Sequence, residues 1–336
     1  MVTTKDVAQK AGVSTATVSR VINGSARVSP ATRARILQVI QELNYVPDGL
    51  ARGIATQRSH ILGMIVPDIR NGAFAEIYLG ASDYASQHGY VVWLVNSNDN
   101  PVKEREVWLQ LRQVRVDGVL VTPVNDAENH EIWRSAPVPL CILDRNIRTN
   151  PWDFIGIDNF HGLYDATRVL LDYHHTHIGI IAGPQSNSAG RDRLAGYQAA
   201  MQEAGYPISA ATVAIGDFHE SSGYALGQHL LRQDPRPTAI IVCNNLMMLG
   251  FLHALAQAPD VRLGSELAVI GFDDFPLATV LHPAISVVSS PMRTLGARGA
   301  ELLISRLQQP KRPIQHVVLS PHMILRGSER QNSVKT

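Results

Sequence analysis

From Ile61 onward, the chain alternates short apolar runs rich in β-branched residues with longer stretches of helical periodicity. Buried strands that alternate with helices are typical of parallel sheets covered on both faces. There are too many such runs for one compact sheet, and the pattern restarts at Ile178, after a helix expected between about Phe160 and Tyr173. We therefore predict a core of two similar, doubly wound α/β lobes. In chain order the expected strands are ILGMIV, YVVWLV, GVLVT, PLCIL, FIGI, IGIIAG, TAIIVC, LAVIGF, ISVV and VVL.

The segment before this core has helical patterns and no strand signal. We expect three helices, over residues 3–11, 14–22 and 30–43. We therefore predict a small all-α head, residues 1–58, ahead of the core, residues 59–336. The residues expected to cap the three helices are Thr3 or Thr4, then Ser14, then Ser29 followed by Pro30.

Positive charge is concentrated in that head. Residues 1–58 hold eight Lys or Arg against three Asp or Glu, a net charge of +5. The whole chain of 336 residues carries 30 basic and 29 acidic side chains, which leaves 22 against 26, or −4, for the core. A basic head on a mildly acidic body indicates a polyanion such as nucleic acid as the partner of the head. Charge alone leaves an ordinary solvated surface as an equal alternative.

The strongest local motif is DVAQKAGVSTATVSRVING, residues 6–24. Each of its two helices can bury one apolar face, and Gly12 supplies the tight turn between them. The start of the second helix is then exposed, where a helix-turn-helix presents side chains to the major groove; a three-helix cap without a ligand is the plainer alternative. Small hydroxyl residues, Ala and Arg suit base edges, thymine methyls, and guanine or phosphate in turn. The exposed positions are Thr15, Ala16, Thr17, Ser19 and Arg20, and the inward ones are Val7, Ala8, Ala11, Val13, Val18 and Val21.

The head resembles that of the LacI/GalR family of bacterial repressors. The start VSTATVSRVING, a third helix ending in ELNYVP and the LAR segment that follows occur in the order typical of that family, and the similarity covers the entire head. The resemblance implies a sequence-specific DNA-binding transcriptional regulator, most simply a repressor. The residues that it implies for operator contact are Thr15, Ala16, Thr17, Ser19, Arg20 and Asn23.

The resemblance also implies a hinge helix at about residues 46–56, in which Leu50 wedges into the minor groove. Such a wedge costs roughly a few kcal/mol of base unstacking, offset by the contacts that bent DNA permits. Asp48 and Gly53 stand where the family usually has Asn and Ser, and glycine makes a helix costlier to order. We expect the hinge to fold only when two heads pair on a palindromic operator. The hinge residues assigned to DNA binding are Leu50, Ala51 and Arg52.

Three motifs of the core each follow an apolar run: GPQSNSAGRDRLAGY, CNNLMMLG and VIGFDD. Ligands of doubly wound sheets bind beyond the carboxyl ends of the strands, so these motifs are expected to converge. A hydroxyl-rich ligand needs forked donors, paired acceptors and a flat apolar surface. Taken singly, each candidate also has an ordinary explanation as a surface ion pair, a turn cap or a core ring. The candidates are Arg193, Asp273 with Asn244, and Phe218.

The core resembles that of the same family, which is similar to periplasmic sugar-binding proteins, from GMIVPDI to the C-terminal RGS. By that resemblance the core binds a small effector, most simply a sugar, with a purine or nucleoside corepressor as the alternative. Asn245 replaces the family's usual Asp, and Asn-Gly-Ala-Phe at residues 71–74 replaces its common Asn-Pro-Phe-Phe. The effector-binding residues implied are Phe74, Asp144 and Arg145 in the first lobe and Arg193, Phe218, Asn244 and Asp273 in the second.

Two other classes of protein fit parts of the chain. An enzyme is one, because the loop IIAGPQSNSAG follows a strand and could hold a phosphate, but the sequence has no GxGxxG after a strand and no GxxxxGK[ST], GxSxG or HExxH motif. An extracytoplasmic sugar receptor is the other; it would need a signal sequence and no basic head. We therefore predict a regulator without catalytic residues or a cofactor.

Location and assembly follow from simpler features. No run is long enough for an apolar transmembrane helix and the N-terminus lacks the apolar core of a signal peptide, so we expect a cytoplasmic protein. Cys141 and Cys243 lie in apolar runs, where free buried thiols are expected. The segment YHHTH at residues 173–177 has no Cys or carboxylate within it, so we expect histidines that cap or solvate a helix end, and no metal. The polar tail after Arg326 has no heptad pattern, which favours a homodimer over a coiled-coil tetramer.

Overall fold

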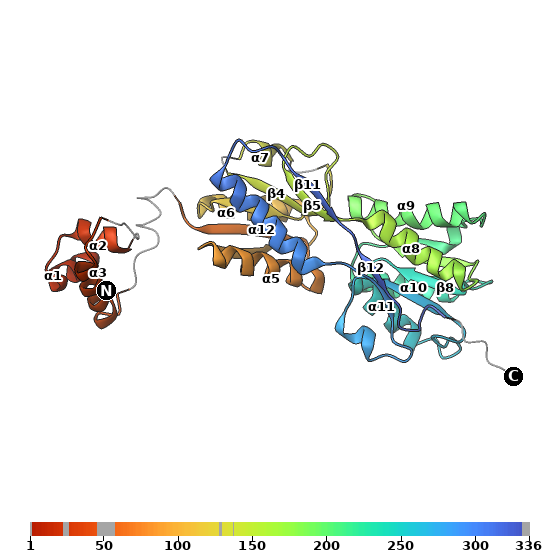
Figure 1. Ribbon diagram of the computed structural model, residues 1–336. Coiled ribbons are helices and arrows are strands. Elements are labelled where there is room, and N and C mark those ends of the chain that lie inside the picture. Colours follow the sequence, from red (N-terminus) through yellow and green to blue (C-terminus); the bar gives the residue numbers. More distant parts are fainter. Residues whose placement is uncertain (1, 23–26, 46–57, 128–129, 137, 331–336) are drawn as a thin grey trace. The chain divides into compact units, whose positions relative to one another are not determined.

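The structure is a computed structural model that describes residues 2–22, 27–45, 58–127, 130–136 and 138–330. The chain divides into two compact units, Met1–Ser59 and His60–Thr336, called the head and the core below (Figure 1). Within the described ranges, no helix combines the length and apolar character needed to cross a membrane.

Three helices make up the described part of the head, as predicted: α1 (Thr4–Ala11), α2 (Thr15–Ile22) and α3 (Pro30–Glu42). Thr3 and Asp6 form a capping box at the start of α1, and Gly12 ends that helix in the left-handed conformation, with φ of 64°. Ser29 caps α3 ahead of Pro30. The helices enclose a small apolar core, whose buried residues are Val7, Ala8, Ala11, Val18, Val21, Ile36, Val39 and Tyr45.

Two six-stranded sheets organise the described part of the core. The first sheet has the order β11-β5-β4-β3-β1-β2 and the second the order β12-β10-β9-β8-β6-β7. Neighbouring strands are parallel, except that β12 runs antiparallel to β10. The first sheet comprises β1 (Ile61–Val66), β2 (Val91–Asn96), β3 (Gly118–Val121), β4 (Leu140–Asp144), β5 (Asp153–Ile157) and β11 (His316–Leu319). The second comprises β6 (Ile178–Ala182), β7 (Val213–Ile215), β8 (Ala239–Val242), β9 (Ala268–Phe272), β10 (Ser286–Ser289) and β12 (His322–Ile324).

Helices cover the sheets and complete the two lobes that the sequence predicted. The helices of the first lobe are α5 (Gly72–Gln87), α6 (Pro101–Gln113), α7 (His130–Arg134) and α12 (Met292–Gln308). Those of the second lobe are α8 (Asn159–Asp172), α9 (Ser188–Glu203), α10 (Glu220–Leu231) and α11 (Asn245–Ala256).

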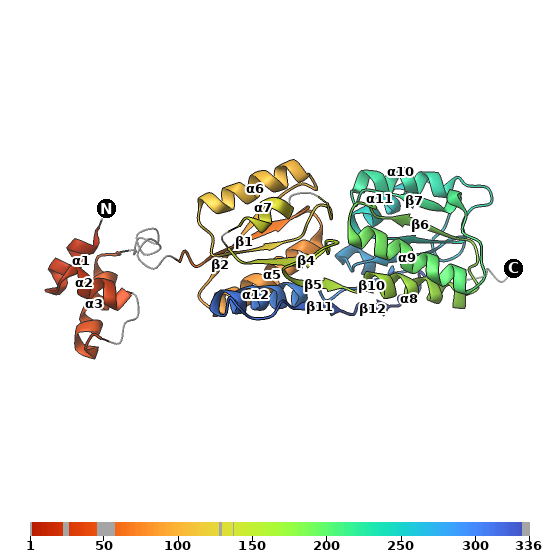
Figure 2. The ribbon, with the colours of Figure 1, turned by 90° about the horizontal axis from the view of Figure 1, so that it is seen from above.

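The lobes are not consecutive in the chain. The chain enters the second lobe after β5, returns to the first after β10 to form α12 and β11, and crosses again to form β12 (Figure 2). The sequence pattern predicted two lobes but gave no sign of this return. It also missed β7 and β12, since strands of three residues carry too little periodicity to detect.

The returning helix α12 is held against α5 by a close backbone approach. A Cβ at Gly80 of α5 would lie 1.9 Å from the carbonyl oxygen of Arg293, and one at Gly296 of α12 would lie 1.9 Å from the carbonyl oxygen of Ile77. Both distances are far below van der Waals contact, so any side chain at these positions would push the helices apart.

The cysteines and the histidine segment complete the comparison with the sequence. Cys141 and Cys243 are buried free thiols, as expected, and burial raises the pKa of Cys243 to about 12. The expectation of a solvated histidine segment is wrong for His175, which is buried with its Nδ1 3.0 Å from Oγ1 of Thr238. The apolar surroundings also lower the pKa of His175, which keeps the ring neutral.

The Gly80 contact can be tested by adding one methyl group. Gly80→Ala is expected to reduce the free energy of unfolding of the core by about 1–3 kcal/mol, because the helices must separate. Gly72→Ala is the matched control in the same helix: no atom lies within 4 Å of its Cβ position, so stability should stay unchanged or rise slightly. Urea denaturation followed by circular dichroism measures both. Equal stability of the two variants would contradict the close packing.

Candidate functional site

Helix α2 presents an exposed polar face on the head. Thr15, Ala16, Ser19 and Arg20 are exposed, whereas the apolar residues between them point into the head. The tight turn at Gly12 sets the start of α2, as a helix-turn-helix requires. The other residues expected to contact DNA, Asn23, Leu50, Ala51 and Arg52, and the hinge helix expected at about 46–56 lie outside the described residues.

Thr17 differs from its neighbours on α2. It is half-buried, and its Oγ1 lies 2.9 Å from Oγ of Ser14 in a hydrogen bond. The same Ser14 oxygen accepts a hydrogen bond from the Thr17 N–H at 3.2 Å, which caps the start of the helix as predicted. Thr17 therefore helps to set the start of α2, and the four exposed residues form its outward face.

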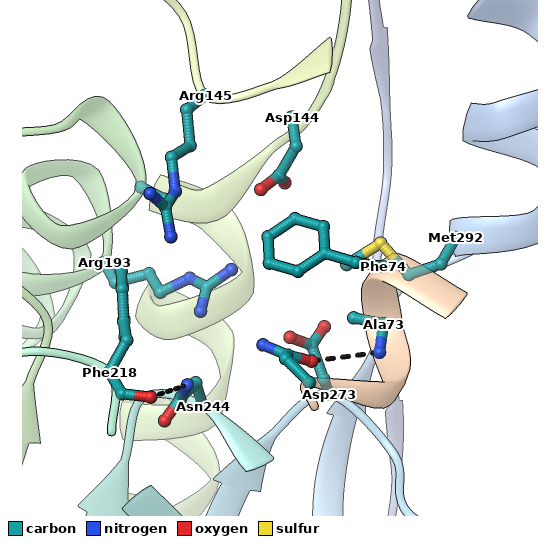
Figure 3. A pocket seen from close by; sticks show the side chains of 11 residues that line it. Ala73, Phe74, Asp144, Arg145, Arg193, Phe218, Asn244, Asp273 and Met292 are labelled. Atoms are coloured by element: carbon teal, nitrogen blue, oxygen red, sulfur yellow. Dashed lines mark hydrogen bonds between the residues drawn. The ribbon is translucent and has the colours of Figure 1, made fainter. Parts of the chain in front are cut away.

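In the core, the carboxyl ends of strands from both lobes surround a cavity of about 310 Å³. All seven residues expected to bind an effector line it, although they are spread over some 200 positions of sequence, from Phe74 to Asp273. Figure 3 shows their side chains directed toward this shared space. The lining residues are Asn71, Ala73, Phe74, Asp144, Arg145, Ala189, Arg193, Phe218, Asn244, Asp273 and Met292.

Three of these residues adopt the left-handed backbone conformation. The φ angles are 61° at Asp144, 70° at Phe218 and 67° at Asp273. Non-glycine residues rarely adopt it, and such strain of about 1–3 kcal/mol persists mainly where the surroundings enforce it, often at functional sites. The Phe218 ring lies against Gly183, where a Cβ would come within 2.1 Å of a ring atom. The chain therefore turns sharply at the strand ends and aims these side chains inward.

Arg193 is held rigidly although it is only 3% exposed. Its Nε donates a hydrogen bond to Oδ1 of Asn159 at 2.7 Å, and its Nη1 donates to the backbone carbonyl of Cys243. The guanidinium carbon lies 3.6 Å from the ring centre of Phe272 and 5.7 Å from that of Phe218. Hydrogen bonds and ring faces thus stabilise a buried charge that water no longer solvates.

Arg145, from the first lobe, is equally buried, at 3% exposure. Its Nη1 donates a hydrogen bond to Oδ1 of Asp99 at 2.8 Å and lies close to two backbone carbonyl oxygens. Its guanidinium carbon lies 5.9 Å from the ring centre of Phe74 and 5.5 Å from that of Phe218. Because Phe218 belongs to the second lobe, this stacking joins the two walls of the cavity.

Asn244 lines the cavity, but its side chain serves the protein. Its Oδ1 accepts a hydrogen bond from the Met247 N–H at 2.8 Å and caps α11, while its Nδ2 donates to the carbonyl oxygen of Phe218 at 2.9 Å. Both ends of the amide are therefore engaged. The amide positions the Phe218 ring, and the expectation of Asn244 as a paired acceptor beside Asp273 needs a ligand to use the remaining lone pair of Oδ1.

The two carboxylates of the cavity have unused acceptor atoms. Asp144 and Asp273 are buried, and Oδ1 of each has no hydrogen-bond partner among the described residues. Burial raises the pKa of Asp273 to about 6; the charge of Arg193 opposes this rise and that of Asp144 adds to it. An unpaired buried acceptor costs about 1–3 kcal/mol, so both atoms are prepared for a donor from a ligand.

Ion pairs beside the cavity join the lobes. Oδ2 of Asp126, which follows β3, accepts hydrogen bonds from Nη2 of Arg191 at 2.7 Å and from Nε of Arg148 at 3.1 Å. The Asn146 N–H donates to Oγ of Ser188 at 2.8 Å. These contacts link the first lobe to the start of α9, the helix that carries the buried arginine.

Sequence reasoning missed several residues of the site. Met292 reaches the cavity because α12 returns to the first lobe, and no local pattern signals such a return. Asp99 and Asn159, which hold the two arginines, likewise had no signal. Asn71 was detectable, because it caps α5 by accepting a hydrogen bond from the Ala73 N–H at 2.9 Å, and a cap before an apolar helix is a recognisable pattern.

Comparison with known proteins gives the family. Residues 3–48 match the family model of bacterial regulatory proteins of the lacI family, and residues 167–329 match that of the periplasmic binding protein-like domain. The ribose operon repressor of Escherichia coli is 35% identical over 330 residues, which cover 98% of this chain and 100% of the relative. The chain belongs to the LacI family.

Further LacI-family relatives agree over the full length. The HTH-type transcriptional repressor PurR of Edwardsiella ictaluri is 34% identical, with 98% of this chain and 97% of the relative covered. The structure of the lac repressor dimer bound to operator and the anti-inducer ONPF matches with a TM-score of 0.87 at 27% identity, covering 98% of this chain and 99% of that one. The predicted helix-turn-helix head and two-lobed core, and the class of transcriptional regulator, are confirmed for this LacI-family protein.

Asp273 gives a test of strain in the LacI-family core. Because its folded pKa of about 6 exceeds the value of an unfolded Asp, the folded state holds an extra proton between about pH 4 and 6 and loses stability as the pH rises through that window. Asp273→Asn should therefore raise the free energy of unfolding at pH 7.5 by about 1–3 kcal/mol. The gain should shrink toward pH 4.5.

Urea denaturation at the two pH values measures this difference. Asp274→Asn is the matched control, because hydrogen bonds from Arg326 lower the pKa of Asp274 and its charge is stabilising. That variant should show no gain at pH 7.5. A destabilised Asp273→Asn protein at pH 7.5 would contradict the strain of the buried charge.

Proposed function

We propose that this chain is a transcriptional repressor that binds operator DNA through α2 and changes its DNA affinity when a small molecule, most simply a sugar, occupies the cavity between the lobes. One observation carries the proposal: a head with an outward polar helix face is joined to a core in which seven side chains from both lobes converge on one cavity. The first is a reader of base edges, and the second is a site for a compact polar ligand.

The proposed working unit is a homodimer on a palindromic operator, in the cytoplasm. One α2 helix reads a single half-site, so two heads related by two-fold symmetry match a palindrome. The lac repressor structure with 27% identity is a dimer bound to operator, which supports the same arrangement here.

Control follows from the position of the cavity. A ligand that touches both lobes binds best to the arrangement in which both walls meet it, so it shifts the core toward that arrangement. We propose binding without turnover, because the buried arginines and Asn244 are engaged by the protein itself. The sign of the response depends on which arrangement favours DNA. The similarity to PurR supports the alternative of a purine corepressor in the same cavity.

Arg20 is expected to carry part of the sequence specificity. Binding sites are first selected from random DNA with the full-length protein. Arg20→Ala should then weaken binding to the selected site by about 10-fold to 100-fold and weaken binding to random DNA far less. Arg35→Ala, an exposed position on α3, is the control. Fluorescence anisotropy at fixed salt measures both; equal losses on the two DNAs for Arg20→Ala would argue against base reading.

Arg193 is expected to couple effector to operator. Arg193→Ala should abolish the effect of a ligand on DNA binding and leave ligand-free operator binding within about threefold, because the head has its own core. The ligand is found first by a thermal-shift screen of sugars, sugar acids, sugar phosphates and purines. Arg232→Ala, at the end of α10 and outside the cavity lining, is the control. An unchanged ligand response of Arg193→Ala would remove the residue from the site.

A further inference from the structure

The cavity of the core contains two buried carboxylates that come from different lobes. Asp144 ends β4 of the first lobe with 6% exposure, and Asp273 follows β9 of the second lobe with 5% exposure. Oδ1 of each is without a hydrogen-bond partner among the described residues. A buried carboxylate oxygen is an acceptor only, so each of the two atoms calls for a donor group on the ligand.

The positive charges of the cavity leave no surplus for an anion. Arg145 is paired with Asp99 at 2.8 Å, a carboxylate that does not line the cavity. Arg193 faces Asp144 and Asp273, the charges that shift the titration of the Asp273 carboxyl in opposite directions. Two guanidinium groups therefore oppose two lining carboxylates, with a third carboxylate behind Arg145. A phosphate or carboxylate ligand would meet like charge from both lobes at short range in a buried site, where repulsion is poorly screened.

The remaining lining sets size and shape. The volume of about 310 Å³ lies at the lower end of the range for ligand pockets, which suits a molecule of one sugar ring. The rings of Phe74 and Phe218 offer apolar surface for the C–H face of such a ring. The guanidinium of Arg145 lies over both rings, so these two faces do not form an open pair between which a flat base could stack.

We propose, resting on the proposed function, that the effector is an uncharged polyhydroxy compound of monosaccharide size that donates one hydroxyl to Asp144 and another to Asp273. The two hydrogen bonds anchor the ligand to one lobe each. The ligand thereby bridges the lobes, and its phosphate esters and sugar acids are rejected by the same carboxylates. This specificity is a property of the two acidic side chains and is separate from the grip of the arginines.

Matched ligand sets test the class. Full-length protein at pH 7.5 is titrated calorimetrically with neutral aldopentoses, aldohexoses and their alditols, with the corresponding phosphates and uronic acids, and with hypoxanthine and guanine. We expect the tightest ligand to be neutral and to bind at least about tenfold more tightly than its own phosphate or acid. A phosphate, an acid or a purine as the tightest ligand would overturn the proposal, and so would the failure of every neutral compound to bind at 10 mM.

Variants then test the two contacts. Asp144→Asn and Asp273→Asn should each weaken the neutral ligand by about tenfold or more, because an amide offers a weaker acceptor than a carboxylate. Asp274→Asn is the matched control: this neighbouring carboxylate is bound by Arg326 and lies outside the lining, so affinity should stay the same. Thermal denaturation verifies that each variant is folded. Unchanged affinity in a folded Asp144→Asn or Asp273→Asn protein would overturn the bridge.

The same samples separate this inference from the proposed function. Binding of the wild-type protein to its selected DNA site, measured without ligand, tests the regulator itself. If that binding fails while a neutral sugar still binds through both carboxylates, the proposed function fails and the ligand class stands. If DNA binding holds and a charged ligand is preferred, the ligand class alone is wrong.

Discussion

The buried guanidinium of Arg193 is the constraint around which the second lobe is organised at the cavity. A charge with 3% exposure must find partners within the protein, and it finds them in Asn159, the Cys243 carbonyl and the ring of Phe272. These partners begin α8, follow β8 and end β9. The ends of several strands must therefore meet at one point, and the cavity exists because they do. Removing the charge would remove the reason for that meeting.

The cavity is also where the core gives up stability that the two sheets supply. Buried strands of both lobes are apolar throughout, whereas the strand ends carry left-handed backbone at Asp144, Phe218 and Asp273 and unpaired carboxylate oxygens. Such features are costly in a ligand-free protein and become favourable contacts when a donor arrives. The ion pairs of Asp126 beside the cavity work in the other direction, because they join the lobes with or without a ligand. The balance between these two sets of contacts governs how strongly a ligand can shift the core.

Most of the fold was legible in the sequence because it depends on local patterns. Helix caps, the Gly12 turn and apolar runs gave the helices of the head and all the longer strands. The placement rule for strand ends brought together seven residues that do line one cavity. What failed was non-local or depended on side-chain geometry. The return of α12 to the first lobe rests on a contact between Gly80 and Arg293, more than two hundred residues apart. The engagement of Asn244 with Phe218 depends on side-chain orientation, which residue type does not determine.

The interleaved path of the chain has a consequence for how the protein is made. A ribosome releases residues in order, and the head, with its own apolar core, can fold as soon as it emerges. The first lobe cannot be finished then, because α12 and β11 come from residues 292–319, and the second lobe waits for β12 at residues 322–324. Both lobes therefore close almost together at the end of synthesis. Until that moment, a nascent chain carries a folded head on an incomplete core, and loss of even the last 20 residues would be expected to leave both the sheet edge at β12 and the buried Ser328 and Glu329 without partners or place.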